Sequence, residues 1–231
     1  MLNRRHIRIK VLQLLYSKST AKSDYKDLIK DYNNRSINFY RLFISYFLLF
    51  EKLFYEFFKK EKIISKKNYE NDSSGIKRMI LKNEILLFFK KSTRLQKLKI
   101  KYNIDIWDKN IKIIESLFDE IFKSELFRNY ESVDTPDFKN RKQIIIDIFK
   151  NIIVKNSLLY QLFEEEELEW IDDFPLVNTL FLNYLKSYDL SKKNNIPIKI
   201  FSDKEDNEFG KNLFNAKFLH LRYLNNGSPL L

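Results

Sequence analysis

The sequence contains no cysteine and only two histidines, His6 and His220, among its 231 residues. Without cysteine the chain can form no disulfide, no reactive thiolate and no cysteine-based metal site. A single histidine on a helix is far more often structural than catalytic. The groups that catalysis needs are therefore scarce, and we expect a protein that is not an enzyme and holds no cofactor or metal ion.

Turn-forming residues are also scarce. Glycine occurs three times and proline four times, which is few for a sheet protein, because the turns between strands depend on such residues. The glycines, Gly75, Gly210 and Gly227, stand far apart, so they cannot build a glycine-rich phosphate loop. This composition favours an all-α fold.

No apolar run is long enough for a membrane. The longest uncharged apolar stretch, residues 42–50, has nine residues, whereas a helix needs about 20 to cross a bilayer. The basic N-terminus is not followed by an apolar segment of the secretory type. We therefore expect a cytoplasmic protein without a membrane partner.

Positive charge is in excess, with 42 Lys and Arg against 31 Asp and Glu, a net charge of +11. Such a surplus favours an anionic partner, which is a nucleic acid, an acidic protein or a membrane surface. The many lysines also fit the drift of an AT-rich genome, which raises the charge without any ligand. Net charge alone does not separate these alternatives.

Most of the chain shows the spacing of apolar residues typical of amphipathic helices. The segments expected to be helical are residues 4–18, 25–32, 38–62, 76–90, 108–128, 137–156, 158–169, 175–188 and 205–224. Residues 66–75 are polar and end in a glycine, so we expect a flexible loop there. The predicted fold is an all-α helical bundle.

The first helix carries a cluster of arginines. Arg4, Arg5 and Arg8 fall within five consecutive positions, although the chain has only ten arginines in all. The planar guanidinium group binds phosphate with two hydrogen bonds and stacks on bases. His6 and Lys10 are expected to extend this basic surface around the helix. The cluster predicts contact with RNA or DNA, and the alternative is a merely solvated basic N-terminus.

Arg4 and Arg8 lie one turn apart on the same side of this helix. They continue the line of the apolar residue Leu15 toward the N-terminus. We therefore expect the first turns to project beyond the packed core and to leave the basic end free for a ligand.

This opening helix resembles that of NusB, a family of bacterial transcription antitermination factors. The family begins with a basic RRxxR segment that runs into an apolar stretch with Gln and then Leu-Tyr. The matching residues here are Arg4, Arg5, Arg8, Gln13, Leu15 and Tyr16. Similarity to a longer form of the family, which carries a helical insertion, continues in residues 107–130, 170–173, 177–179, 203–209 and 213–214.

The resemblance implies an all-helical protein that binds the boxA element of nascent ribosomal RNA transcripts through its first helix. It implies Arg4, Arg5, Arg8 and Tyr16 as RNA-binding residues. It also implies two protein partners, the small-subunit ribosomal protein NusE and the RNA polymerase antitermination complex. The NusB-like N-terminal helices are expected over residues 1–65, the loop over 66–75, the helical insertion over 76–202 and the start of the NusB-like core over 203–231.

The family continues into a helical C-terminal half that has no counterpart here, and much of the NusE-binding surface belongs to that half. We expect such a shortened core to expose apolar surface and to favour self-association. Two other functions stay open on the sequence. One is a helical protein-interaction scaffold, and the other is an RNA-binding accessory domain of a ribosomal RNA methyltransferase.

Overall fold

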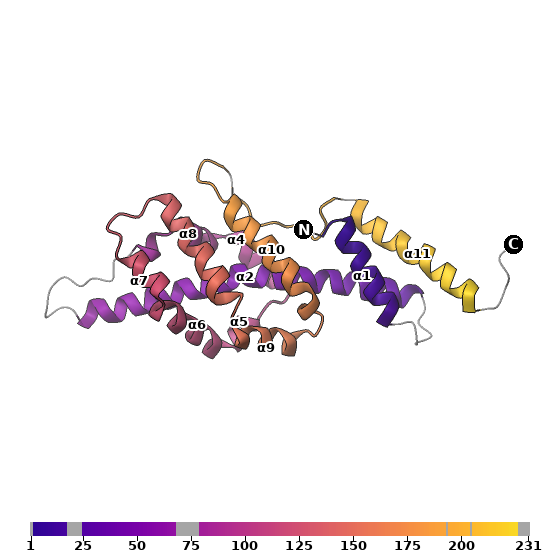
Figure 1. Cartoon of the computed structure of the whole chain (residues 1–231), viewed down its shortest axis with the longest axis horizontal. Coiled ribbons are helices and arrows are strands. Elements are labelled where there is room, and N and C mark those ends of the chain that lie inside the picture. Colours follow the sequence, from indigo (N-terminus) through magenta and orange to yellow (C-terminus); the bar gives the residue numbers. More distant parts are fainter. Residues whose placement is uncertain (1, 18–24, 68–78, 193, 204, 226–231) are drawn as a thin grey trace. The chain divides into compact units, whose positions relative to one another are not determined.

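The computed structural model describes residues 2–17, 25–67, 79–192, 194–203 and 205–225. Over these ranges every regular element is a helix, as Figure 1 shows, and the one β-type contact is an isolated parallel bridge between Leu2 and Phe201. The predicted all-α fold is confirmed. No helix within the same ranges has the length and apolarity that crossing a bilayer requires.

The chain divides into two compact units. Unit 1 joins Met1–Tyr40 to Pro197–Leu231, and unit 2 is the continuous segment Arg41–Ile196. The boundaries expected from the sequence, residues 65 and 202, differ from these. The first division falls inside a helix, where the sequence shows no break.

That helix is α2, which runs without interruption over Tyr25–Lys67. Two helices separated by residues 33–37 were expected here, and this expectation is wrong. The buried side chains Leu28, Tyr32, Ser36 and Phe39 recur every three or four residues through the polar stretch, so the same face stays packed. The Ser36 hydroxyl is satisfied within the helix, because it donates to the Tyr32 carbonyl oxygen at 2.8 Å.

The end of α2 also corrects the predicted loop. Lys66 and Lys67, which begin the expected loop, are the last residues of the helix. The remainder of the expected loop, residues 68–75, lies outside the described residues.

Unit 1 contains α1 (Arg4–Ser17), the first part of α2 and α11 (Glu205–Asn225). Helices α1 and α11 lie side by side (Figure 1). Ile7 and Leu14 of α1, Tyr32 of α2 and Phe214 of α11 are all buried. The ring of Phe214 meets that of Tyr32 edge-on at 5.4 Å, so the two ends of the chain share one small core.

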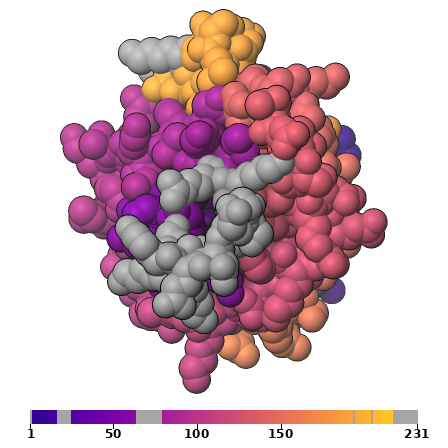
Figure 2. Space-filling view, turned by 90° about the vertical axis from the view of Figure 1, so that its left-hand side faces the viewer, coloured from indigo at the N-terminus to yellow at the C-terminus, as the bar shows by residue number. Residues whose placement is uncertain are grey.

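Unit 2 contains the rest of α2 and a series of shorter helices. These are η1 (Ile80–Lys82), α3 (Glu84–Lys91), α4 (Thr93–Lys101), α5 (Ile106–Lys109), α6 (Ile111–Lys123), α7 (Glu125–Glu131), α8 (Phe138–Ile148), the π-helical turn η2 (Phe149–Ile153), α9 (Ser157–Glu166) and α10 (Trp170–Ser187). In Figure 2 the purple-to-magenta residues that begin at η1 and α3 lie on the left of this unit, and the rose residues of α7 and α8 lie on the right.

The core of unit 2 is aromatic. Phe47 of α2 packs against the rings of Phe89 on α3 and Phe181 on α10, at centroid distances of 5.2 and 4.8 Å. Tyr46 meets Phe149 at 5.1 Å, and its buried hydroxyl donates to the Asn178 side chain at 2.5 Å. Each such ring pair adds about 0.5–1.5 kcal/mol beyond the burial of its area. These contacts explain why α2 holds so many Phe and Tyr residues.

Polar caps divide this part of the chain more finely than apolar spacing predicts. Residues 108–128 were expected to form one helix, but the chain breaks at Asn110 and again at Ser124, whose hydroxyl accepts from the Phe127 N–H at 3.1 Å. Helix α4 was not expected, and only Leu95 and Leu98 of its nine residues are buried. Side-chain caps therefore start α4 at Ser92 and α7 at Ser124, whereas α6 starts at Asn110 without one.

Candidate nucleic-acid interface

The start of the chain is tied to the segment before α11. The Leu2 N–H donates to the Ile200 carbonyl at 3.0 Å, and the Ser202 N–H donates to the Leu2 carbonyl at 2.8 Å. The side chain of Leu2 is fully buried. The expectation that the first turns project beyond the packed core is therefore wrong, because packing begins before the first helical residue.

His6 belongs to a reciprocal cap at the start of α1. The His6 N–H donates to Asn3 Oδ1 at 3.2 Å, and the Asn3 N–H donates to His6 Nδ1 at 3.4 Å. Burial, together with the nearby charges of Arg5 and Lys10, lowers the pKa of His6 below its ordinary 6.5. A neutral imidazole with Nδ1 as acceptor fits this cap, so His6 serves α1 as a structural residue.

Arg4 and Arg8 face α11. Arg4 Nε donates to Asp206 Oδ1 at 3.4 Å, and its guanidinium also lies 3.7 Å from the Glu205 carboxylate. The guanidinium carbons of Arg4 and Arg8 are each 5.3 Å from the centroid of the Phe209 ring. Arg4 therefore helps to hold α1 on α11, while Arg8 touches the same ring and stays exposed.

Lys10 does not extend the basic surface. Its side chain is only 7% exposed, and Nζ lies 5.3 Å from the centroid of the buried Phe39 ring. The prediction that Lys10 is available to RNA is wrong. Position 10 falls between Ile7 and Val11 on the buried face of α1, which its residue type alone does not reveal.

The exposed face of α1 carries Arg5, Ile9, Leu12 and Tyr16, which follow the i, i+4, i+7, i+11 spacing of one helical stripe. We call these four residues the α1 stripe. Leu12 is 61% exposed and Tyr16 is 85% exposed. The predicted site residues Arg5 and Tyr16 therefore share a face, with exposed Arg8 beside it. Ile9 and Leu12 were missed, although the same spacing is present in the sequence.

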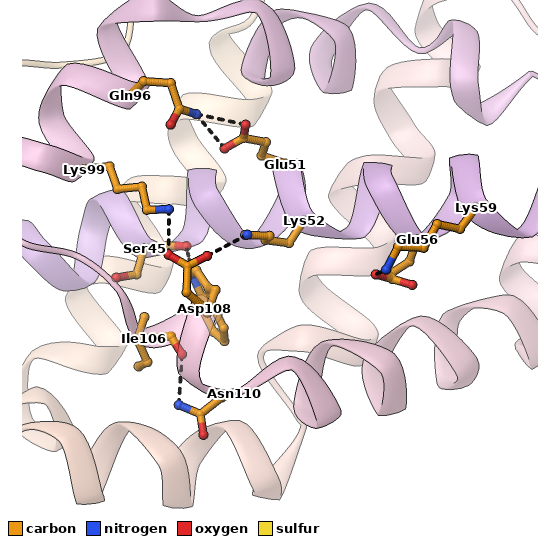
Figure 3. Close-up of polar contacts among 11 residues, drawn as sticks. Ser45, Glu51, Lys52, Glu56, Lys59, Gln96, Lys99, Ile106, Asp108 and Asn110 are labelled. Carbon is orange, nitrogen blue, oxygen red and sulfur yellow. Dashed lines mark hydrogen bonds and ion pairs between the residues drawn. The ribbon is translucent and has the colours of Figure 1, made fainter.

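Unit 2 contains a separate polar cluster, shown in Figure 3. Asp108 of α5 accepts from Lys52 of α2 at 2.7 Å and from Lys99 of α4 at 2.6 Å. Burial raises the pKa of Asp108, but the hydrogen bonds from both lysines outweigh it, so the pKa lies below the ordinary value. The carboxylate is thus paired twice and joins three helices.

A second part of that cluster centres on the buried Glu51. Glu51 of α2 accepts two hydrogen bonds from the Gln96 amide of α4, at 2.9 and 3.0 Å (Figure 3). Burial raises the pKa of Glu51 above its ordinary 4.5. Trp107, the residue before Asp108, donates its indole N–H to the Ser45 carbonyl at 2.7 Å. These contacts clamp α4 and α5 onto α2, so we assign the cluster to the fold.

The described residues hold no group of side chains that could bind a metal ion. No three His, Cys, Asp or Glu side chains there converge as a metal site.

The chain matches no protein-family model, no curated protein and no solved structure.

Proposed function

We propose that the chain is an RNA-binding transcription antitermination factor of the NusB type, acting in the cytoplasm on boxA-like sequences of nascent ribosomal RNA. The exposed combination of Arg5, Arg8 and Tyr16 on α1 carries the proposal. Two guanidinium groups supply phosphate contacts, and an exposed phenol ring supplies a surface on which an unpaired base stacks. NusE and the polymerase complex are the protein partners that belong to this function.

Arg4 plays a different part in this proposal. Its Nε pairs with the buried Asp206 carboxylate at 3.4 Å, so its removal would disturb folding as well as binding. The binding test therefore replaces Arg5 and Arg8 and leaves Arg4 in place.

The test measures binding of a labelled boxA-like RNA and of a scrambled RNA by fluorescence anisotropy at several salt concentrations. Each lost phosphate contact lowers the salt slope by about 0.7 for a single strand. We expect Arg5→Ala/Arg8→Ala to weaken binding and to lower the slope by about 1.4. Arg5→Lys/Arg8→Lys, which keeps the charge but loses the planar group, should bind with intermediate affinity.

The matched control removes the same charge elsewhere in unit 1, as Lys26→Ala/Lys30→Ala on the exposed side of α2. We expect that variant to keep most of the affinity and the preference for boxA-like RNA. Equal losses in both variants, or unchanged binding by the arginine variant, would contradict the proposal.

A second function, self-association, is favoured by one observation. The spacing of the α1 stripe is symmetric, because positions 5, 9, 12 and 16 are separated by four, three and four residues. Two antiparallel copies would place Arg5 of one copy against Tyr16 of the other, and Ile9 against Leu12. A two-fold contact requires such self-complementary surfaces, and this one would compete with RNA for the same face.

A further inference from the structure

Basic residues gather in one short segment of unit 2. Residues 90–101 contain six basic side chains and no acidic one. They span the end of α3 and the whole of α4. The opposite holds for residues 164–173, which contain seven acidic side chains and no basic one. Residues 90–101 are therefore a wholly basic stretch of unit 2, and residues 164–173 a wholly acidic one.

Most of these cations have no carboxylate partner. Of the six, Lys99 pairs with Asp108, and Arg94 donates to the Ile196 carbonyl at 3.4 Å. Among the described side chains, Lys90, Lys91, Lys97 and Lys101 form no ion pair. Unpaired ammonium groups of this kind are free to meet an external anion.

Aromatic rings lie between the cations. Lys90 Nζ lies 4.8 Å from the centroid of the buried Phe54 ring, 5.6 Å from that of Phe58 and 5.8 Å from that of Tyr55, all on α2. Lys62 Nζ lies 4.4 Å from the Phe58 centroid. Tyr55 is 39% exposed and Phe58 is 36% exposed. We call Tyr55, Phe58, Lys62 and Lys90 the lysine–aromatic surface.

We propose that the lysine–aromatic surface is a second binding site for single-stranded nucleic acid, separate from α1. Alternating ammonium groups and ring faces are what proteins use to hold a single strand, because cations bind its phosphates and rings stack on its bases. Each ammonium has three donors, so contact with a ring leaves N–H groups free for phosphate. A single strand fits better than a duplex, whose bases are already stacked.

The site extends the proposed function to a longer stretch of the same transcript, but its chemistry does not depend on boxA recognition. Stacking on any base is sequence-tolerant. This surface should therefore raise affinity for all single strands equally, whereas α1 should supply the preference for boxA-like RNA.

The experiment uses the full chain and three probes. They are a labelled single-stranded oligouridine, the duplex it forms with its complement, and vesicles containing anionic phospholipid. One variant, Lys62→Ala/Lys90→Ala, removes the cations. Another, Tyr55→Leu/Phe58→Leu, removes the rings and keeps apolar bulk. The control, Lys112→Ala/Lys150→Ala, removes the same charge from exposed lysines of α6 and η2. Circular dichroism checks that each variant stays helical.

We expect the cation variant to lower the salt slope for oligouridine by about 1.4. The ring variant should weaken binding by about fivefold or more at an unchanged slope, because each stacked base contributes about 1 kcal/mol or more. The control variant should bind oligouridine with nearly the affinity and the salt slope of the parent. The ring variant is the decisive one, since diffuse charge attraction would be insensitive to it.

Three results would overturn the inference. The first is a control variant that binds oligouridine as weakly as the cation variant does. The second is a ring variant that binds oligouridine as tightly as the parent does. The third is vesicle binding that depends on these residues while oligouridine binding does not. The last result would identify a membrane surface instead. If Arg5→Ala/Arg8→Ala loses the boxA preference while the lysine–aromatic variants keep all their affinity, the proposed function stands and this inference fails. The reverse pattern would keep this site and reject α1.

Discussion

Gly210 of α11 lies so close to Tyr32 of α2 that a Cβ added at Gly210 would overlap the hydroxyl oxygen and Cζ of that tyrosine. The next atom in the way, Cγ2 of Ile7, would be 3.1 Å from it. The same burial raises the pKa of Tyr32 to about 12. One glycine therefore allows three helices of unit 1 to meet.

Replacing Gly210 with Ala should destabilise unit 1 by about 1–3 kcal/mol through overpacking, despite the better helix propensity of alanine. Urea denaturation measures the free energy of unfolding. In a Tyr32→Leu background, where the ring is gone, the added cost of Gly210→Ala should be much smaller. A Gly210→Ala variant as stable as the parent would show that the helices separate easily.

The arginines of α1 should differ in their effect on stability. Arg4→Ala removes the cation beside the buried Asp206 carboxylate and should cost about 1–2 kcal/mol. Arg5→Ala removes an exposed side chain and should stay within about 0.5 kcal/mol of the parent. Chemical denaturation of both variants under the same conditions makes the comparison. Equal costs would mean that the contact of Arg4 with α11 contributes nothing.

The cap formed by Asn3 and His6 should make stability depend on pH. The pKa of His6 is lowered in the folded state, so its contribution is complete above pH 6.5 and is lost as the pH falls through the folded pKa. His6→Gln should abolish that part of the dependence. NMR titration of the imidazole gives the folded pKa directly, and a value at or above 6.5 would contradict the assigned cap.

The pH dependence of stability contributed by Glu51 should have the opposite sign to that of His6. Its pKa is raised in the folded state, so it favours folding most below pH 4.5, and this contribution declines as the pH rises through the folded pKa. Glu51→Gln keeps an acceptor for Gln96 and removes the buried charge. We expect this variant to be at least as stable as the parent at pH 7 and equal to it below pH 4.5. A loss of stability at pH 7 would show that the ionised carboxylate is needed.

The α1 stripe should control self-association. Leu12→Asp places a charge at the centre of the stripe, and the fold should change little because Leu12 is 61% exposed. Sedimentation velocity over a range of concentrations should show less dimer than the parent does. As a control, Leu168→Asp changes an exposed leucine of unit 2 that is 72% exposed. If both variants associate like the parent, the stripe is not the contact.

The helical class and the first helix followed from the sequence, because Ile7, Val11 and Leu14 repeat at helical spacing. The length of α2 did not follow. Asn33, Asn34 and Arg35 look like a break, and only contacts with distant residues show that Tyr32 and Ser36 continue the buried face. Helix α10 likewise begins at Trp170 and not at the expected Pro175, because buried Trp170 anchors the turn before the proline.

The candidate site was predictable only in part. The spacing of Arg5 and Tyr16 on one face is present in the sequence, and so is the cluster of arginines. Lys10 is buried because it packs on Phe39, and Arg4 is paired because it meets Asp206. Both partners lie elsewhere in the chain. A pattern within one helix cannot show which of its faces a later helix will cover.

The pairing of Arg4 with Asp206 joins residues 202 positions apart. During synthesis α1 leaves the ribosome before α11, on which it packs, because all of unit 2 is made between them. Domains generally fold as units while the chain grows, so unit 2 has its whole sequence available while α1 still waits for its neighbour. Through that interval α1 lacks the cover that α11 gives to Arg4 and to its apolar residues. Although α1 precedes unit 2 in the chain, it therefore reaches its final surroundings only after unit 2 has been made.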